Sequence, residues 1–351
     1  MRLKAIILVV SVICCSLLAC VKDEPFIPSY TVPPTYDFED IDSIITARLI
    51  MLHGVKNYLL SGTDSVLNAE IATALWTNTD SAFTPAMVPN FIYKAERLNR
   101  MRSTNLSGDT RDADILKSFI DSAVTVSASH NVAGSNGVPG WQMLSNPSEK
   151  RLFSSIGIEY TEVWEKAMLG AMCLYRVNSQ LSNPANATAW AQAFHYSGIP
   201  RDYDPTINYG DSPNRPLAIA TLFPNAESIQ AGSKIFEDFR RGRAAVNAGD
   251  LRVATLAKDS LLLNIEKVFA LSAIHYLDAA KDGNTADKLY NLSRAFGTII
   301  ALNYRSSKQL LNDEAYIMIL EVFDNNFYTL IQNPTAITNI RNVLATAYEF
   351  H

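Results

Sequence analysis

His275 and Asp278 are the pair of side chains in this sequence best suited to binding a metal ion. They lie three residues apart in the segment AIHYLD, and on a helix residues at this spacing share one face. An imidazole and a carboxylate on one face can ligate iron or zinc, but a working site needs a further ligand from another helix. The alternative is a histidine at the edge of the core, hydrogen-bonded by a neighbouring acid, and the spacing alone favours this interpretation.

A second group of polar and aromatic residues lies where a predicted helix meets a long loop. The helix ends at His195 and Tyr196, and the loop contains Arg201 and Tyr203. With Trp190, these side chains place hydrogen-bond donors, acceptors and aromatic faces together where the helix meets the loop. This combination suits a cleft for a glycan, a peptide or another polar ligand. In the alternative interpretation, His195 interacts with the helix dipole and Arg201 pairs with a neighbouring aspartate.

Three arginines, Arg240, Arg241 and Arg243, stand within four residues of one another. Their guanidinium groups can hold an anionic ligand or a carboxylate from another helix, although a structural network explains such a cluster equally well. The sequence contains no HExxH, GxSxG or glycine-rich phosphate loop, and Cys173 lies in an apolar segment typical of core packing. The sequence therefore identifies no catalytic residue.

The overall composition limits the classes of protein that need to be considered. Of 351 residues, 48% are hydrophobic and 19% are charged, which is too apolar for a disordered chain and too polar for a protein with many membrane spans. Lys and Arg number 30 against 35 Asp and Glu, giving a net charge of −5. This balance argues against a general nucleic-acid-binding protein.

Apolar residues recur at steps of three and four through most of the chain, which predicts an all-α fold built as a helical bundle. We expect two packed bundles, over residues 37–182 and 183–351. No segment alternates with a period of two, so we expect no strands. Two long irregular loops, over 129–150 and 197–225, interrupt the helices. Helices are predicted over residues 37–61, 64–76, 86–101, 112–127, 154–181, 187–196, 227–248, 251–281, 285–304, 312–331 and 334–348.

The first residues are typical of an export signal. Arg2 and Lys4 precede an apolar run that ends in Leu-Leu-Ala-Cys20, and this ending resembles the bacterial lipoprotein box, in which the signal (1–19) is removed and the cysteine is lipidated. A plain secretory signal or an uncleaved anchor is the alternative. Shortly after Cys20, a lysine is followed by two acids (Lys22, Asp23 and Glu24), and this pattern resembles the surface-export signal of Bacteroidota lipoproteins. Residues 20–36, rich in proline, are then expected to form an extended tether from the membrane.

Four segments resemble an uncharacterised, imelysin-related family of Bacteroidota lipoproteins. The segment AWAQAFHYSGIP at 189–200 is similar to the family's WDEAFGYxGxP, and the other three are EKAMLGA at 165–171, GRAAV at 242–246, and 265–277. The resemblance implies an all-α fold, an outer-membrane address and no established activity. The sequence departs from the family at Ala191 and Gln192, which replace two acids, and at His195, which replaces glycine. Loss of these acids removes the proton carriers of that segment.

These observations favour a lipid-anchored outer-membrane protein, on the periplasmic or the external face, that acts as a ligand-binding or uptake accessory component and is not an enzyme. One alternative is a metal-dependent, imelysin-like peptidase or iron-uptake protein that uses His275 and Asp278. Another is a structural surface protein whose bundle faces contact a partner. The expected partners are the membrane, through Cys20, and a glycan, peptide or metal ligand.

Overall fold

The computed structural model describes residues 29–38, 43–79, 82–84, 87, 110–210, 215–306 and 310–350. Within these ranges the protein is mainly α-helical, and its only sheet has two strands. The prediction of an all-α fold is therefore confirmed. The signal peptide over 1–19, the lipidation site Cys20 and, except for Met87, the predicted helix over 86–101 lie outside the described residues.

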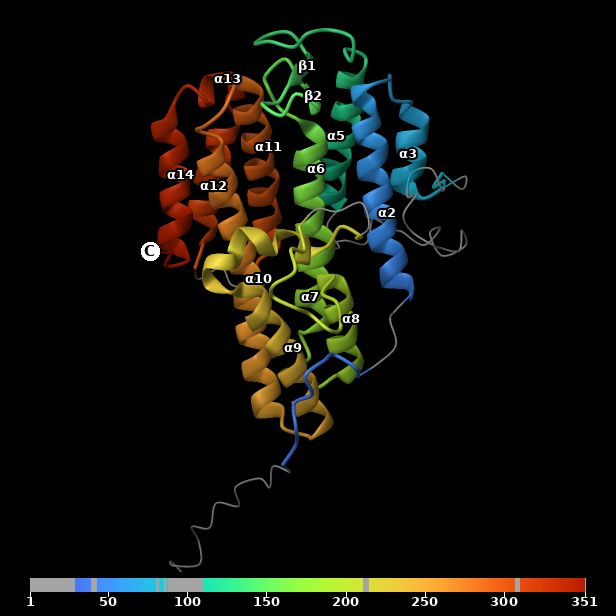
Figure 1. The fold of residues 1–351 in the computed structure, drawn as a ribbon, viewed down its shortest axis with the longest axis vertical. Coiled ribbons are helices and arrows are strands. Elements are labelled where there is room, and N and C mark those ends of the chain that lie inside the picture. The colour runs from blue at the N-terminus through green and yellow to red at the C-terminus, as the bar shows by residue number, and fades with distance from the viewer. Residues whose placement is uncertain are drawn as a thin grey trace, which may run out of the picture.

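Helices from both ends of the chain form the larger, upper part of the molecule (Figure 1). Its centre is α6 (Tyr160–Met168), which packs against α11 (Thr285–Ala301) and against α5 (Thr110–Ser127). The other elements of this part are α2 (Ser43–Leu60), η1 (Ser61–Thr63), α3 (Ala69–Thr77), η6 (Leu302–Tyr304), α12 (Asp313–Phe323), α13 (Phe327–Leu330) and α14 (Pro334–Ala347).

A smaller group of helices extends below the first (Figure 1). It contains α7 (Tyr175–Gln180), α8 (Ala187–Ser197), α9 (Ala231–Asn247) and the long α10 (Leu251–Ala279). Because α10 packs against α9 and also against α11 and α14, it joins the two groups. Among the described residues, α10 is the one helix long and apolar enough to cross a membrane, but 61% of its apolar window is buried inside the fold. A central core helix passes the same test.

The helix starts follow capping chemistry that is legible in the sequence. The side chain of Asn312 accepts a hydrogen bond from the first turn of α12, and Pro334 stands in the first turn of α14, as expected. The predicted start of the helix over 64–76 is wrong: α3 begins at Ala69, and the Asn68 side chain accepts hydrogen bonds from the N–H groups of two residues in its first turn. Residues 64–68 contain more than one side chain able to cap a helix, and the packing of α3 decides that Asn68 is the one used.

A short hairpin contradicts the expectation of no strands. β1 (Gly140–Met143) pairs antiparallel with β2 (Lys150–Phe153), in a stretch predicted as loop up to residue 150. Each strand has only four residues, which is too short to show an alternating pattern. The predicted helix over 154–181 accordingly begins later, at Tyr160.

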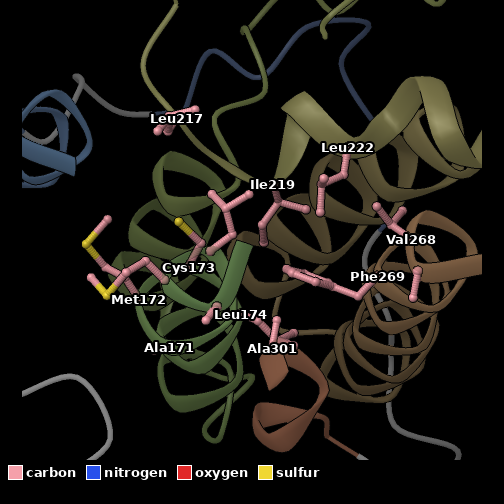
Figure 2. Packing of buried hydrophobic residues seen from close by; sticks show 14 of the residues in the cluster. Ala171, Met172, Cys173, Leu174, Leu217, Ile219, Leu222, Val268, Phe269 and Ala301 are labelled. Carbon is pink, nitrogen blue, oxygen red and sulfur yellow. The ribbon is translucent and has the colours of Figure 1, made fainter. Parts of the chain in front are cut away.

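The core is continuous through both parts of the molecule. α6 runs into α7 through the π-helical segment η4 (Leu169–Leu174), where a Cβ added to Gly170 would lie 2.4 Å from the Ala301 Cα. Figure 2 shows Ile219 of η5 (Ile219–Ile229) beside Phe269 of α10, with Cys173 of η4 close by. Cys173 is buried, as predicted, and burial raises the pKa of its thiol.

The described N-terminal residues 29–38 lie against the lower helices and do not form a free tether. Tyr36 is buried, its ring stacks on Phe194 of α8 with centroids 3.8 Å apart, and its N–H donates to the Arg201 carbonyl at 2.8 Å. Arg240 of α9 donates to the Pro33 carbonyl at 2.8 Å. The chain is therefore attached to the fold before the end of the predicted tether at residue 36.

Candidate functional site

A surface pocket of about 450 Å³ lies between the loop that follows α8 and the segment that joins η5 to α9. We call it the Tyr203 pocket. Its volume lies within the range of small-molecule and peptide-side-chain sites. Apolar walls are formed by Tyr203, Pro205, Ile207, Tyr209, Phe223 and Pro224, and polar groups come from Thr206, Asn208, Glu227, Gln230 and Ser233.

Aromatic stacking fixes the shape of this pocket. The rings of Tyr203 and Tyr209 stack with centroids 4.9 Å apart, and the Arg215 guanidinium lies over the Tyr209 ring at 4.5 Å. Phe223 and Phe236 meet the Tyr203 ring at 6.1 and 5.4 Å. Such contacts order a loop without regular secondary structure, and burial raises the pKa of Tyr203. Its hydroxyl is therefore neutral at neutral pH, and it interacts with the Ser233 side chain.

The backbone brings the second wall close to Tyr203. Gln230 adopts a left-handed conformation, with φ of 53°, and so turns the chain sharply from η5 into α9. A Cβ at Gly232 would lie 2.2 Å from the Tyr203 hydroxyl, so only glycine permits this approach. On the loop side, Asp204 accepts a hydrogen bond from the Thr206 N–H at 2.8 Å, which closes a turn.

The polar groups of the pocket suit a ligand with an amide backbone and a positive charge. The amide side chains of Asn208 and Gln230 provide both donors and acceptors. Among the described residues that line the pocket, Glu227 is the one with a charged side chain, and it is exposed. The Thr206 hydroxyl donates to the Asp204 carboxylate at 2.7 Å, and the other polar groups of the lining residues are suited to hydrogen bonding with a ligand.

The structure separates the six residues predicted to bind a ligand. Of these, Tyr203 lines the pocket, whereas Trp190, Tyr196 and Arg243 are buried in the core. The Trp190 indole N–H donates to the Pro184 carbonyl at 2.9 Å. The cleft expected at the end of α8 is thus filled by the packed core, because the aromatic side chains of Trp190 and Tyr196 are buried.

The two remaining predicted residues, His195 and Arg201, are partly buried beside the N-terminal segment. The Arg201 guanidinium lies 3.9 Å from the Asp37 carboxylate, an acid distant in sequence. The His195 ring lies 6.2 Å from that of Phe194. Neither lines the Tyr203 pocket, so the loop contributes one of its predicted residues to the site.

The predicted metal pair lies on α10, away from the Tyr203 pocket. Asp278 is 2.6 Å from Lys281 and 3.6 Å from Arg341, so its carboxylate already has two cationic partners. His275 lies on the surface; desolvation by neighbouring groups and the nearby Arg294 lower its pKa, while Asp278 acts in the opposite direction. Among the described residues, no group of three His, Cys, Asp or Glu side chains is placed to hold a metal ion.

The arginine cluster of α9 contacts the N-terminal segment. Arg240 holds the Pro33 carbonyl, and the Arg243 guanidinium lies 5.2 Å from the centre of the Phe38 ring. A Cβ at Gly242 would lie 2.1 Å from the Trp190 ring, so the segments at 242–246 and 189–200 pack directly on each other. Contacts within the fold thus account for Arg240 and Arg243.

A buried ionic network surrounds α6, and the sequence analysis did not identify it. We call it the α6 cluster. The Glu165 carboxylate lies 2.7 Å from the Lys56 amine and also contacts Lys166. Glu162 accepts a hydrogen bond from the Tyr290 hydroxyl at 3.1 Å and lies 3.5 Å from Arg294. Its members are Lys56 of α2, Glu162, Glu165 and Lys166 of α6, and Tyr290 and Arg294 of α11.

Charges within the α6 cluster control the protonation of its members. Burial alone would raise the pKa of Glu165, but Lys166 and Lys56 outweigh it and hold this pKa far below its usual range. At the start of α6, burial and the nearby Glu162 carboxylate raise the pKa of Glu159 to about 8. Two carboxyl groups on one helix therefore differ in charge at neutral pH.

The sequence contained only a weak signal for most of the Tyr203 pocket. Tyr209, Phe223 and Glu227 fall within or just after the loop predicted at 197–225, and loop length raised the expectation of a site there. Nothing local, however, indicated that these residues meet. Their pairing depends on the Gln230 turn and on the space left by Gly232.

In comparisons with known proteins, one region of the chain matches a protein family. A family model described as "Domain of unknown function (DUF4856)" matches residues 218–351. This domain contains the segments at 242–246 and 265–277 and one wall of the Tyr203 pocket, whereas the segments at 165–171 and 189–200 precede it. No curated protein and no solved structure matches the chain.

Proposed function

We propose that this protein is a lipid-anchored outer-membrane component that binds peptide segments in the Tyr203 pocket. The single observation that carries the proposal is the composition of the pocket: aromatic and proline walls, two amide side chains and one carboxylate, Glu227. Apolar walls accept a side chain, amides pair with a peptide backbone, and a carboxylate favours an amine. The preferred ligand is therefore a short peptide with a lysine or a free N-terminus.

The membrane address rests on the first residues of the chain. The sequence Leu-Leu-Ala-Cys20 and the preceding apolar run resemble a lipoprotein signal. In the described part of the chain, residues 29–38 lie on the lower helices, and the β1–β2 hairpin lies at the opposite pole (Figure 1). A lipid at Cys20 would thus hold the lower pole towards the membrane.

We also infer a distant relationship with the imelysin-related lipoproteins. Direct packing of Gly242 on Trp190 supports it, because two of the four similar segments meet in the core. The relationship leaves the proposed binding role unchanged, since Ala191 and Gln192 stand where that family has acids.

Metabolic labelling with an alkyne fatty acid tests the anchor. We expect the full-length protein to take up the label and to fractionate with the outer membrane, and Cys20→Ser to do neither. External protease applied to intact cells then shows whether the domain faces the exterior. An unlabelled wild-type protein would contradict the proposed anchor without affecting the pocket.

Fluorescence anisotropy with short labelled peptides tests the pocket. The detergent-solubilised full-length protein is titrated with peptide pools that carry lysine, glutamate or neither. We expect the lysine pool to bind best, Tyr203→Ala to weaken binding at least about tenfold, and Glu227→Gln to remove the preference for lysine. Glu237→Gln, an exposed change on α9 outside the pocket, serves as the matched control. Equal binding of all three pools, or full binding by Tyr203→Ala, would overturn the proposal.

A further inference from the structure

A second pocket, of about 480 Å³, lies between α5 and the chain that joins β2 to α6. We call it the hydroxyl pocket. The residues that α5 contributes are three or four positions apart, so they form a polar stripe on one face of the helix. The polar residues that line it are Ser118, Asp121, Ser122 and Thr125 from α5, and Ser154, Ser155 and Tyr160 from the opposite wall.

Several of these hydroxyl groups have unused hydrogen-bonding capacity. Within the described part of the chain, the hydroxyls of Ser122, Ser155 and Tyr160 make no hydrogen bond to another protein group, and all three residues are partly exposed to solvent. The Ser118 and Thr125 hydroxyls donate to carbonyls of their own helix at 2.7 and 2.8 Å, so they remain available as acceptors. The pocket therefore offers donors and acceptors from both walls.

The charge of the hydroxyl pocket is low. Asp121 is the one carboxylate among the lining residues, and Lys117 on the same helix contacts one of its oxygens. No residue with a positive charge is among the described residues that line the pocket. An anionic ligand such as a phosphate would lack a partner here, since anion sites use arginine, lysine or exposed backbone N–H groups.

A polar group also lies behind the inner wall. A small cavity of about 10 Å³ shares Val126 and Tyr160 with the hydroxyl pocket, and the Glu159 side chain lines it. Glu159 is 3% exposed and accepts a hydrogen bond from the Glu162 N–H at 2.6 Å. The pocket is thus backed at this point by a buried carboxyl group and not by apolar core alone.

We propose that the hydroxyl pocket binds a neutral sugar. A pyranose ring carries several hydroxyl groups, each both donor and acceptor, which can replace water on the solvent-facing hydroxyls of two walls of a pocket. Pro139 and Val126 supply apolar surface for the faces of the ring. This site is separate from the Tyr203 pocket: it lies beside the hairpin, and the two pockets share no lining residue.

Saturation-transfer NMR on the detergent-solubilised full-length protein tests this site. One probe mixture contains D-glucose, D-mannose, D-galactose and N-acetyl-D-glucosamine, and a second contains trisaccharides of the same sugars. We expect transfer to at least one sugar, and its loss in Ser122→Leu, which places a larger apolar side chain in the pocket. Thr73→Leu, an exposed change on α3, is the control. Thermal unfolding checks that both variants remain folded.

The pattern across the two mixtures distinguishes the sources of the sugar. Transfer to the single sugars identifies a site for free sugar, whereas transfer confined to the trisaccharides identifies a glycan chain. Tyr203→Ala should leave either signal unchanged, because it alters the other pocket. Absence of transfer to every probe, or equal transfer in Ser122→Leu and the wild type, would overturn the proposal and leave peptide binding unaffected.

Discussion

The α6 cluster and the Tyr203 pocket both gather polar and aromatic side chains, yet they are suited to opposite tasks. In the α6 cluster, Glu165 lies between two lysines, and all three side chains are buried. In the pocket, Glu227 is exposed and no hydrogen bond or ion pair to its side chain is described. A charge that is paired inside the core is committed to the fold, whereas one at the rim of a pocket stays available to a ligand.

This difference shows that the type of residue is a poor guide to its task in a helical protein. The sequence predicts that Trp190 and Arg243 bind a ligand, but the former packs against Gly242 and the latter lies over Phe38. Glu165 and Lys166, in contrast, belong to a segment that the sequence marks only by a family resemblance, and they are the centre of the buried network. Burial decides which group can act on a ligand.

The largest effect is expected from Glu165→Gln. This change leaves Lys56 and Lys166 buried without their shared carboxylate, so the free energy of unfolding should fall by about 3–5 kcal/mol. Urea unfolding followed by circular dichroism measures it, with Glu237→Gln as the exposed control. A loss below about 1 kcal/mol would show that the cluster is no more important to stability than a surface ion pair.

A smaller effect, and one that depends on pH, is expected from Glu159. Its pKa in the folded protein, about 8, lies above the value of an unfolded glutamate, so the folded state binds the proton more tightly. The stability that this provides is complete below about pH 4.5 and is lost as the pH rises to about 8. Glu159→Gln should therefore remove a pH-dependent loss on the order of a few kcal/mol, measured as unfolding free energy between about pH 5 and 9. If the unfolding free energy of Glu159→Gln depended on pH as steeply as that of the wild type, Glu159 would not be the group that binds this proton.

Tyr203→Ala should separate binding from stability. The ring is half-buried and contacts Tyr209, Phe223 and Phe236, so its removal should lower the free energy of unfolding by about 1–2 kcal/mol. Peptide affinity should fall much more, at least about tenfold. Chemical unfolding and the anisotropy titration measure the two quantities on one sample. If peptide affinity and the free energy of unfolding fell in the same proportion, the Tyr203 side chain would act only through the stability of the fold.

The smallest effect is expected from His275→Ala. The side chain is exposed, and Asp278 is engaged with Lys281 and Arg341, so the free energy of unfolding should change by less than about 0.5 kcal/mol. Elemental analysis of the full-length protein, purified without a histidine tag or chelator, should give equal iron and zinc contents for the wild type and the variant. Near-equimolar metal that disappears in His275→Ala would instead identify a metal site on α10.

Several parts of the structure were predictable because their causes are local. The helical stripe, the Asn312 cap and the Pro334 start each depend on residues within one or two turns. The hairpin was missed because four-residue strands leave almost no pattern.

The sequence by itself determined the class of fold and the positions of most helices, since periodicity and capping act over a few residues. Only the tertiary structure decided which polar side chains are buried and which line a pocket. Lys56 meets Glu165, which lies 109 positions further along the chain, and Tyr203 meets Gly232 across a turn set by Gln230. Such meetings depend on how helices far apart in the chain pack together, and no local pattern records them.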